Sequence, residues 1–281
     1  MRIAFLPLDD RPVKRGAFLH LAAIAGVEVA TPPRALLGAR RLPADVEALW
    51  AWIDAGGAEA DLLIASAELL IYGGLVPSRI GDESLDRCLA LAGKFAGLRR
   101  RAPDRRLWLS ASNLRLPSAP DASEEPEYWA EYGPQIFAYS YHADRFAQTG
   151  DPDSRRRAAD AQAAVPRKVL ADMTARRARN LTVVLSLVDQ AGRGDLDGLL
   201  IGQDDAAEFG LTLPTGPMSW RSGCWRGRSW PRPGRLPPSG WCTPTPRIAT
   251  RFPGTKGRAS TGRSLRTSRR PGAAAWRPER P

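Results

Sequence analysis

The sequence predicts an α/β protein built around a parallel sheet, and three observations support this prediction. Short apolar runs alternate with helical patterns over residues 1–213. Several runs are apolar at consecutive positions, as in strands that are covered on both faces of a sheet. The composition, 43% hydrophobic and 25% charged, is that of a globular chain. We expect a truncated TIM-like barrel, and a doubly wound Rossmann-like sheet is the alternative.

Five apolar segments are predicted as strands, at residues 2–8, 27–30, 61–66, 106–110 and 197–202. An eight-stranded barrel needs roughly 250 residues, so residues 1–213 would hold about five of its eight units. The first segment could be mistaken for a signal peptide, but its apolar run stops at Asp9 and no small-residue cleavage site follows. No apolar run approaches the roughly 20 residues of a membrane span. We therefore expect a cytoplasmic protein with no membrane partner.

Apolar residues at helical spacing predict three helices between the strands. Behind Pro43, one stripe is formed by Val46, Leu49, Trp50 and Ile53. Ser84 is placed to cap a second helix, whose stripe is Leu85, Cys88, Leu89, Ala92 and Phe95. Residues 167–191 form the third, with a stripe of Leu170, Met173, Leu181, Val184, Leu185 and Val188.

Two polar residues interrupt the stripe of the third helix. Arg177 lies four residues after Met173, and Asn180 lies four residues before Val184. A charged group that faces a sheet must be paired or must reach water. We expect a largely buried, paired Arg177, and a guanidinium that reaches solvent at the edge of the stripe is the alternative. Because an anion contact beneath the site would satisfy both side chains, Arg177 and Asn180 are candidate substrate-binding residues.

Residues 117–166 break the alternation of strands and helices. This segment is rich in aromatic residues, is punctuated by proline, and is too long for an ordinary connection. We expect an ordered excursion that passes over a site.

Polar residues follow four of the five predicted strands. In parallel α/β folds, ligands meet the loops at the carboxyl ends of the strands, so these residues are expected to converge on one rim. The candidate catalytic residues are Asp10, Glu68, Asp204 and Asp205. The candidate substrate-binding residues at this rim are Asp9, Arg11, Tyr72, Ser110, Arg115 and Gln203.

Two acidic pairs, Asp9–Asp10 and Asp204–Asp205, follow strands that are not consecutive. Neighbouring carboxylates raise one another's pKa, so one can act as an acid while another acts as a base. This pattern favours a hydrolase, with glycosides as the first substrate class. Asp10 and Asp205 could instead hold Mg²⁺ or Ca²⁺, whereas zinc is disfavoured because the chain has only two histidines. A non-catalytic domain that binds a small molecule is the alternative.

Six segments resemble, in order, the successive blocks of the bacterial domain-of-unknown-function family 4127: "LPLDDRPV", "ATPPRALLG", "SAELLIYGGLVPSR", "SEEPEYWAEYG", "RRARN" and "LLIGQDDAAEFGL". The resemblance implies a bacterial α/β protein and assigns no reaction. The family's third block usually carries an Asp near the position of Glu68, which weakens the case for Glu68 as a site residue. Family members continue with further α/β sequence, so the resemblance implies that residues 1–213 are an incomplete domain, and we expect the chain to be a fragment of a hydrolase. Because such a fragment leaves a sheet edge and apolar faces uncovered, we expect this chain to be aggregation-prone and inactive.

Residues 214–281 form a tail of different composition. They contain 14 Arg and 1 Lys against 1 Glu, with 12 Pro, 9 Gly, 5 Trp, and 5 residues from Val, Ile, Leu, Met and Phe. So few apolar residues cannot build a core, and we expect an irregular tail with no helix or strand docked on the α/β domain. Out-of-frame translation of a GC-rich gene gives this composition and is our explanation. A nucleic-acid-binding tail is the alternative.

Overall fold

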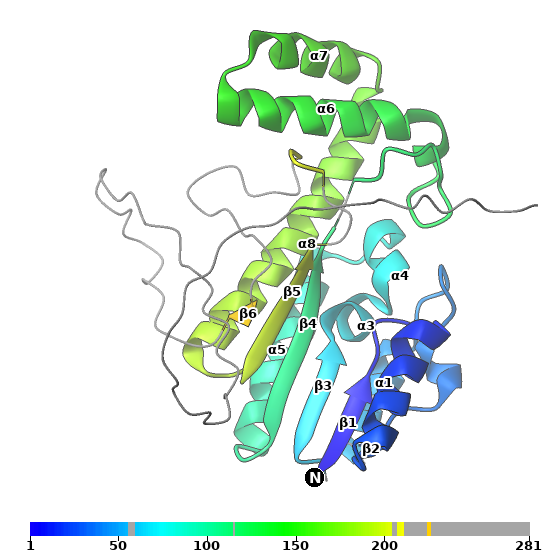
Figure 1. Ribbon diagram of the computed structural model, residues 1–281, viewed down its shortest axis with the longest axis vertical. Helices are drawn as coiled ribbons and strands as arrows, with labels where there is room; N and C mark the ends of the chain where they lie inside the picture. Colours follow the sequence, from blue (N-terminus) through cyan, green and yellow to red (C-terminus); the bar gives the residue numbers. More distant parts are fainter. Residues whose placement is uncertain (56–59, 115, 204–206, 211–223, 226–281) are drawn as a thin grey trace, which may run out of the picture. The chain divides into compact units, whose positions relative to one another are not determined.

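The computed structural model describes residues 1–55, 60–114, 116–203, 207–210 and 224–225. These residues form a sheet with five parallel strands and helices between them (Figure 1). The parallel strands are β1 (Arg2–Leu6), β2 (Glu28–Ala30), β3 (Leu62–Ser66), β4 (Arg106–Asn113) and β5 (Gly198–Gln203). Each coincides with a segment predicted from the sequence, so the α/β class is confirmed.

The parallel strands are ordered β2-β1-β3-β4-β5. β1 therefore lies between β2 and β3, whereas a barrel of strand–helix units places each strand beside the next one in the chain. The observed order is that of a doubly wound sheet and favours this alternative over the truncated barrel. The chain passes from β1 to β2 in one direction across the sheet, and then returns past β1 to form β3, β4 and β5 in the other direction. Right-handed crossovers then place the helices before and after β2 on opposite faces.

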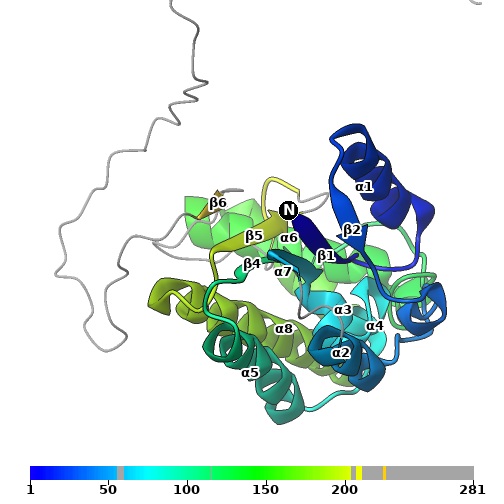
Figure 2. The same cartoon turned by 90° about the horizontal axis from the view of Figure 1, so that it is seen from below.

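Helices lie on both sides of the sheet (Figures 1 and 2). On one side lies α1 (Pro12–Ile24), where Phe18 stacks on Phe5 of β1 with ring centroids 3.9 Å apart. The opposite side carries α2 (Val46–Ala55), α5 (Leu85–Arg101) and α8 (Arg167–Arg193). Their buried residues form one core with the inward-facing residues of the strands, which include Ala4, Leu63 and Leu109.

The predicted stripes of α2 and α5 largely match the core. Leu49, Trp50 and Ile53 of α2 are buried, and the Trp50 indole Nε1 donates to the Leu70 carbonyl at 3.0 Å. At the start of α5, the Ser84 hydroxyl accepts a hydrogen bond from the Arg87 backbone N–H at 3.2 Å, as predicted. Cys88 is a buried free thiol within this core.

The predicted stripe of α8 is only partly right: Met173 is buried, and Leu170, Val184 and Val188 pack against the two cores. The buried residues are Val169, Met173, Asn180, Val183, Leu187, Gln190 and Ala191, whereas Leu181 and Leu185 are 42% and 41% exposed. Two amides lie on the buried line: Asn180 Nδ2 donates to the Ser78 carbonyl at 2.8 Å, and Gln190 Nε2 donates to the Ala92 carbonyl at 3.2 Å. These two amides take positions on the buried face of α8. Part of the predicted apolar stripe, at Leu181 and Leu185, therefore lies outside that face.

The segment after β3 folds into two short helices. α3 (Ala67–Tyr72) begins at Ser66, whose hydroxyl accepts from the Leu69 N–H, and α4 (Leu75–Ile80) follows after two glycines. Gly73 ends α3 with a φ of 82°, and a Cβ there would lie 2.7 Å from the Cβ of Pro43. The two glycines thus turn the chain where it touches the segment after the 3₁₀ helix η1 (Arg34–Leu37).

The excursion at residues 117–166 is ordered, and most of it is helical. α6 (Trp129–Thr149) and α7 (Pro152–Ala163) form a hairpin beyond the carboxyl edge of the sheet (Figure 1). A second core joins this region to the start of α8 and comprises Leu116, Trp129, Ile136, Val165, Val169 and Met173. Trp129 is fully buried, and its Nε1 donates to the Pro117 carbonyl at 3.2 Å, which fixes the loop that precedes α6.

The tail contributes one short strand, contrary to the expectation that no strand would dock on the domain. β6 (Cys224–Trp225) pairs antiparallel with Leu199 and Leu200 of β5. An unpaired sheet edge offers free backbone donors and acceptors, so two extended residues of almost any type can pair there. The rest of the tail lies outside the described residues. Within the part of the chain that the structure describes, no helix has the length and apolar character needed to cross a membrane.

Candidate functional site

A pocket of about 640 Å³ opens at the carboxyl edge of the sheet. Leu8 and Arg11 follow β1, and Arg79 lies on α4 after β3. The rest of the wall comes mainly from the end of β4 and the loop at residues 117–125. It comprises Lys14, Arg40, Leu75, Ser112, Asn113, Leu114, Pro117, Ala119, Asp121, Ser123, Glu124, Glu125 and Gly202. The segments after β1 and β3 meet where the strand order reverses, which is the usual place for a ligand in an open α/β sheet.

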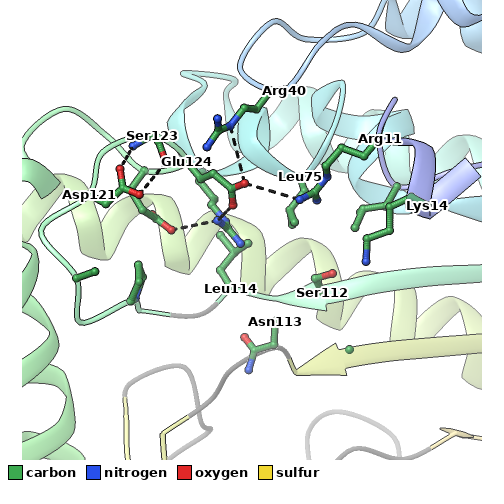
Figure 3. A pocket seen from close by; sticks show the side chains of 16 residues that line it. Arg11, Lys14, Arg40, Leu75, Ser112, Asn113, Leu114, Asp121, Ser123 and Glu124 are labelled. Atoms are coloured by element: carbon green, nitrogen blue, oxygen red, sulfur yellow. Dashed lines mark hydrogen bonds and ion pairs between the residues drawn. The ribbon is translucent and has the colours of Figure 1, made fainter. Parts of the chain in front are cut away.

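Three arginines from three different segments surround one carboxylate in this pocket. Glu124 Oε1 lies 3.7 Å from Arg11 Nη1 and 3.9 Å from Arg40 Nε, and its Oε2 lies 3.2 Å from Arg79 Nη1. Figure 3 shows Arg11, Arg40 and Glu124 pointing toward one another, with Lys14 nearby. The pocket is therefore lined by guanidinium groups that meet at one point.

Arg11 is held in place by Asp9. The Asp9 Oδ2 atom accepts from Arg11 Nη2 at 2.6 Å and from Nε at 2.9 Å, and Oδ1 accepts from the Arg11 backbone N–H at 3.1 Å. The hydrogen bond that Arg11 donates to this carboxylate raises the pKa of Arg11 above its ordinary value. Asp9 thus orients an arginine of the pocket. Asp10 accepts from the backbone N–H of Arg40 at 3.5 Å.

Arg79 is the most deeply buried of the three arginines around Glu124. Its side chain is 4% exposed and lies 3.3 Å from Oε1 of Glu125, whose side chain is 2% exposed. The backbone around Glu125 is fixed by Arg41, whose Nη1 donates to the carbonyls of Ala122 at 2.6 Å and of Glu125 at 3.1 Å. The loop at residues 117–125 is therefore anchored by its backbone as well as by its acidic side chains.

α8 holds the helix that carries Arg79. Arg179 donates from Nη2 to the Ser78 carbonyl at 2.8 Å and from Nη1 to the Gly81 carbonyl at 2.9 Å. Arg176 Nη1 donates to the same Gly81 carbonyl at 2.6 Å, and Asn180 Nδ2 donates to Ser78. These donors satisfy carbonyls at the end of α4 that have no partner within the helix.

Glu68 lies beneath the pocket and outside its wall. One carboxylate oxygen accepts from the Ser66 hydroxyl at 2.7 Å, and the other accepts from the backbone N–H of Ser112, which lines the pocket. Burial raises the pKa of Glu68 above its ordinary value of 4.5, and the hydrogen bonds oppose this shift only in part. In this position Glu68 supports the end of β4.

The structure brings together part of the predicted site. Arg11 lines the pocket, Asp9 and Asp10 contact its arginines, and Glu68 lies one hydrogen bond below it. Arg115, Asp204, Asp205 and the side chain of Gln203 lie outside the described residues, so their predicted roles stay predictions.

Other predicted residues lie elsewhere. Tyr72 is buried in the main core, where the Arg179 guanidinium lies 5.2 Å from its ring centroid. Ser110 is partly buried within β4 and is not part of the pocket wall. Asn180 binds the end of α4, as described above. Arg177 is partly buried on α8, with its guanidinium carbon 5.5 Å from the centroid of the Trp129 ring.

Sequence reasoning gave no site role to Arg40, Glu124 or Glu125. A signal was available in the acidic pair Glu124–Glu125, because it interrupts an aromatic and proline-rich excursion that was expected to lie over a site. Carboxylates placed there need cationic partners. Within the described ranges, no group of three or more His, Cys, Asp or Glu residues could hold a metal ion. The proposed Asp10–Asp205 cation site includes a residue outside those ranges.

The raised pKa of Glu68 predicts a pH-dependent effect of the substitution Glu68→Gln. Since the folded pKa lies above the unfolded one, the stability that Glu68 contributes is complete below about pH 4.5 and is lost as the pH rises through the folded pKa. Glutamine keeps an acceptor for the Ser112 N–H and carries no charge. The free energy of unfolding of the variant should therefore increase relative to the natural chain as the pH rises above 4.5.

Urea denaturation at several pH values measures this difference. Glu127→Gln, at an exposed position of the loop before α6, is the matched control and should show no such trend. A stability difference between Glu68→Gln and the natural chain that stays constant from pH 4 to 8 would contradict the assignment.

Comparison with known proteins gives one match. The sequence profile of the family described as "Protein of unknown function (DUF4127)" matches residues 3–214, which are most of the chain and include every described residue that lines the pocket. No curated protein and no solved structure matches the chain. The chain belongs to the DUF4127 family of proteins of unknown function.

Proposed function

We propose that the pocket binds a small molecule through an anionic group that sits among Arg11, Arg40 and Arg79. The observation that supports this proposal is the convergence of these three guanidinium groups on the single carboxylate of Glu124. Arginine presents a planar set of donors that matches a carboxylate or a phosphate. Glu124 therefore marks the position that an anionic group of a ligand would take.

Two of the three arginines do not depend on Glu124. Arg11 is bonded to Asp9, and Arg79 lies beside Glu125. Glu124 is 23% exposed and can turn toward solvent, so a ligand anion can replace it without leaving these two arginines unpaired. When a ligand anion takes the place of Glu124, one charge-assisted contact replaces another, so the exchange costs little free energy.

The rest of the pocket suits a hydroxylated body. Its wall offers Ser112 and Asn113, which both donate and accept hydrogen bonds, as well as the carboxylate of Asp121. Its volume of about 640 Å³ falls within the usual range for small-molecule sites, about 300–1,000 Å³. Sugar acids and sugar phosphates combine an anion with hydroxyl groups and are the first substrate class to test.

Hydrolysis of a glycosidic bond is the reaction that we propose for this rim. Such a reaction needs two carboxyl groups beside the bond. Arg40 contacts two carboxylates at once, since its backbone N–H donates to Asp10 and its Nε lies 3.9 Å from Glu124. Asp10 and Asp205 are the acid and base that we propose, with Mg²⁺ or Ca²⁺ between them as a variant of the same proposal. A non-catalytic binding domain is the competing function.

The substitution Arg40→Gln should weaken binding of an anionic sugar. Arg40 is 58% exposed, so removal of its charge should cost about 1 kcal/mol, or roughly a fivefold to tenfold loss of affinity. Isothermal titration calorimetry with D-glucuronate and D-glucose 6-phosphate measures this effect, with D-glucose as the neutral control. Arg157→Gln on α7, which is 60% exposed and also paired with a carboxylate, should change nothing. Equal binding of glucose and the two anions would overturn the proposal.

Hydrolysis is tested by a screen of the full chain against aryl glycosides and aryl glucuronides. Any activity that belongs to this rim should fall by a factor of about 100 or more in Asp10→Asn and in Asp205→Asn, because general acid–base catalysis contributes about that much. Asp54→Asn, at an exposed position of α2, is the control. Activity that survives in both rim variants would exclude these carboxylates, and binding without activity would favour the non-catalytic alternative.

The tail is proposed to be an out-of-frame segment of a bacterial cytoplasmic protein. Its composition supports this proposal, with 12 Pro, 9 Gly and a single acidic residue. The nucleotide sequence around codon 213 should encode ordinary α/β-like sequence in a neighbouring frame.

The competing proposal is a tail that binds nucleic acid, which predicts affinity of the full chain for single-stranded DNA that falls steeply with salt. Two results together would favour the nucleic-acid-binding tail over the out-of-frame segment. These are a gene in which only the present frame is open after codon 213, and salt-sensitive binding of the full chain to single-stranded DNA.

A further inference from the structure

A second cavity, of about 250 Å³, lies between the end of β4 and α8. Its wall is mostly carbon and is formed by Leu114 after β4 and by Met173, Leu181 and Val184 on α8. The binding of an anionic group at the first pocket makes no use of this cavity. Its polar residues are Ser112, Asn113, Thr174, Arg177 and Asn180.

Two polar side chains of this wall, those of Asn180 and Arg177, already have contacts. Asn180 donates from Nδ2 to the Ser78 carbonyl and accepts at Oδ1 from Arg179 Nε at 3.0 Å. The guanidinium of Arg177 lies over the Trp129 ring. Burial lowers the pKa of Arg177 to about 10, so the group stays charged at neutral pH, and the carboxylate of Glu125 acts in the opposite direction. An occupant of this cavity therefore meets mainly aliphatic surface.

The cavity adjoins the first pocket at the end of β4, since Ser112, Asn113 and Leu114 line both. Its size also argues for a shared occupant. A volume of about 250 Å³ lies below the usual range for a complete small-molecule site, about 300–1,000 Å³. It exceeds the cavity of about 150 Å³ that holds a benzene molecule in an engineered protein core. The space therefore suits one aromatic ring or a short alkyl chain of a larger molecule.

We propose that the two cavities are the two halves of one site and that its ligand is amphiphilic, with an anionic group among Arg11, Arg40 and Arg79 and an apolar group against α8. This inference rests on the proposed function, because it takes the first pocket as the seat of the anion. The apolar half adds affinity by removing carbon surface from water, and the anionic half fixes the orientation of the ligand. An aryl or alkyl glycoside of a sugar acid has this chemistry.

Four probes separate the contributions of the two halves. Phenyl β-D-glucuronide carries both groups, methyl β-D-glucuronide carries only the anion, phenyl β-D-glucoside carries only the ring, and methyl β-D-glucoside carries neither. Titration calorimetry with the full chain should show phenyl glucuronide binding about tenfold or more tightly than methyl glucuronide, as burial of an aromatic ring predicts. Phenyl glucoside should bind more weakly than phenyl glucuronide.

A pair of variants on α8 tests the location of the ring. Leu181 lines the second cavity, and Leu185, one turn later, is equally exposed and does not line it. Leu181→Asn should reduce the affinity for phenyl glucuronide about fivefold and leave that for methyl glucuronide unchanged. Leu185→Asn should alter neither.

The three possible negative results can be distinguished from one another. Equal affinities for phenyl and methyl glucuronide, in a chain where Arg40→Gln weakens both, would overturn the amphiphilic site and leave the anion seat in place. Equal affinities for phenyl glucuronide and phenyl glucoside would overturn the anion seat itself. A preference for the phenyl group that is undiminished in Leu181→Asn would place the ring outside this cavity and also overturn the inference.

Discussion

The contact between α8 and the end of α4 is the constraint on which the pocket depends. α4 is only six residues long, and a helix of that length has little stability of its own. Arg176, Arg179 and Asn180 donate to the carbonyls of Ser78 and Gly81, so α4 is fixed by side chains that follow it by about a hundred residues. Arg79 is carried on this helix and contacts both acidic side chains, Glu124 and Glu125, of the loop at residues 117–125.

Charges in the pocket divide into an inner pair and an outer group. Arg79 and Glu125 are almost fully buried, and a buried ion pair adds little net stability, while loss of either partner is costly. The inner pair therefore acts mainly to fix geometry. Glu124 is more exposed, and its partners Arg11 and Arg79 each contact a second carboxylate, that of Asp9 and that of Glu125. A ligand can thus displace the outer carboxylate while the inner pair keeps the wall in place.

The elements of the fold were predictable because their patterns are local. Alternating apolar runs located all five parallel strands, and Ser84 marked the start of α5. The order of the strands was not predictable in the same way, since pairing depends on long-range packing that no local pattern records. The stripe of α8 was only partly predictable for a related reason: Asn180 and Gln190 are buried because carbonyls of Ser78 and Ala92, distant in sequence, are there to bind them.

The site was predictable only where it follows a strand directly, as at Arg11. Arg40 and Glu124 come from connections with no periodic pattern, and they meet only when the chain is folded. The segments that carry the family resemblance nevertheless converge there. "LPLDDRPV" supplies Arg11, "SAELLIYGGLVPSR" supplies Arg79, "SEEPEYWAEYG" supplies Glu124, and "RRARN" supplies the donors that hold α4. The segments that resemble the family are therefore also the segments that build this pocket and hold α4. An experiment on the pocket tests a feature formed by the parts of the chain that resemble the family.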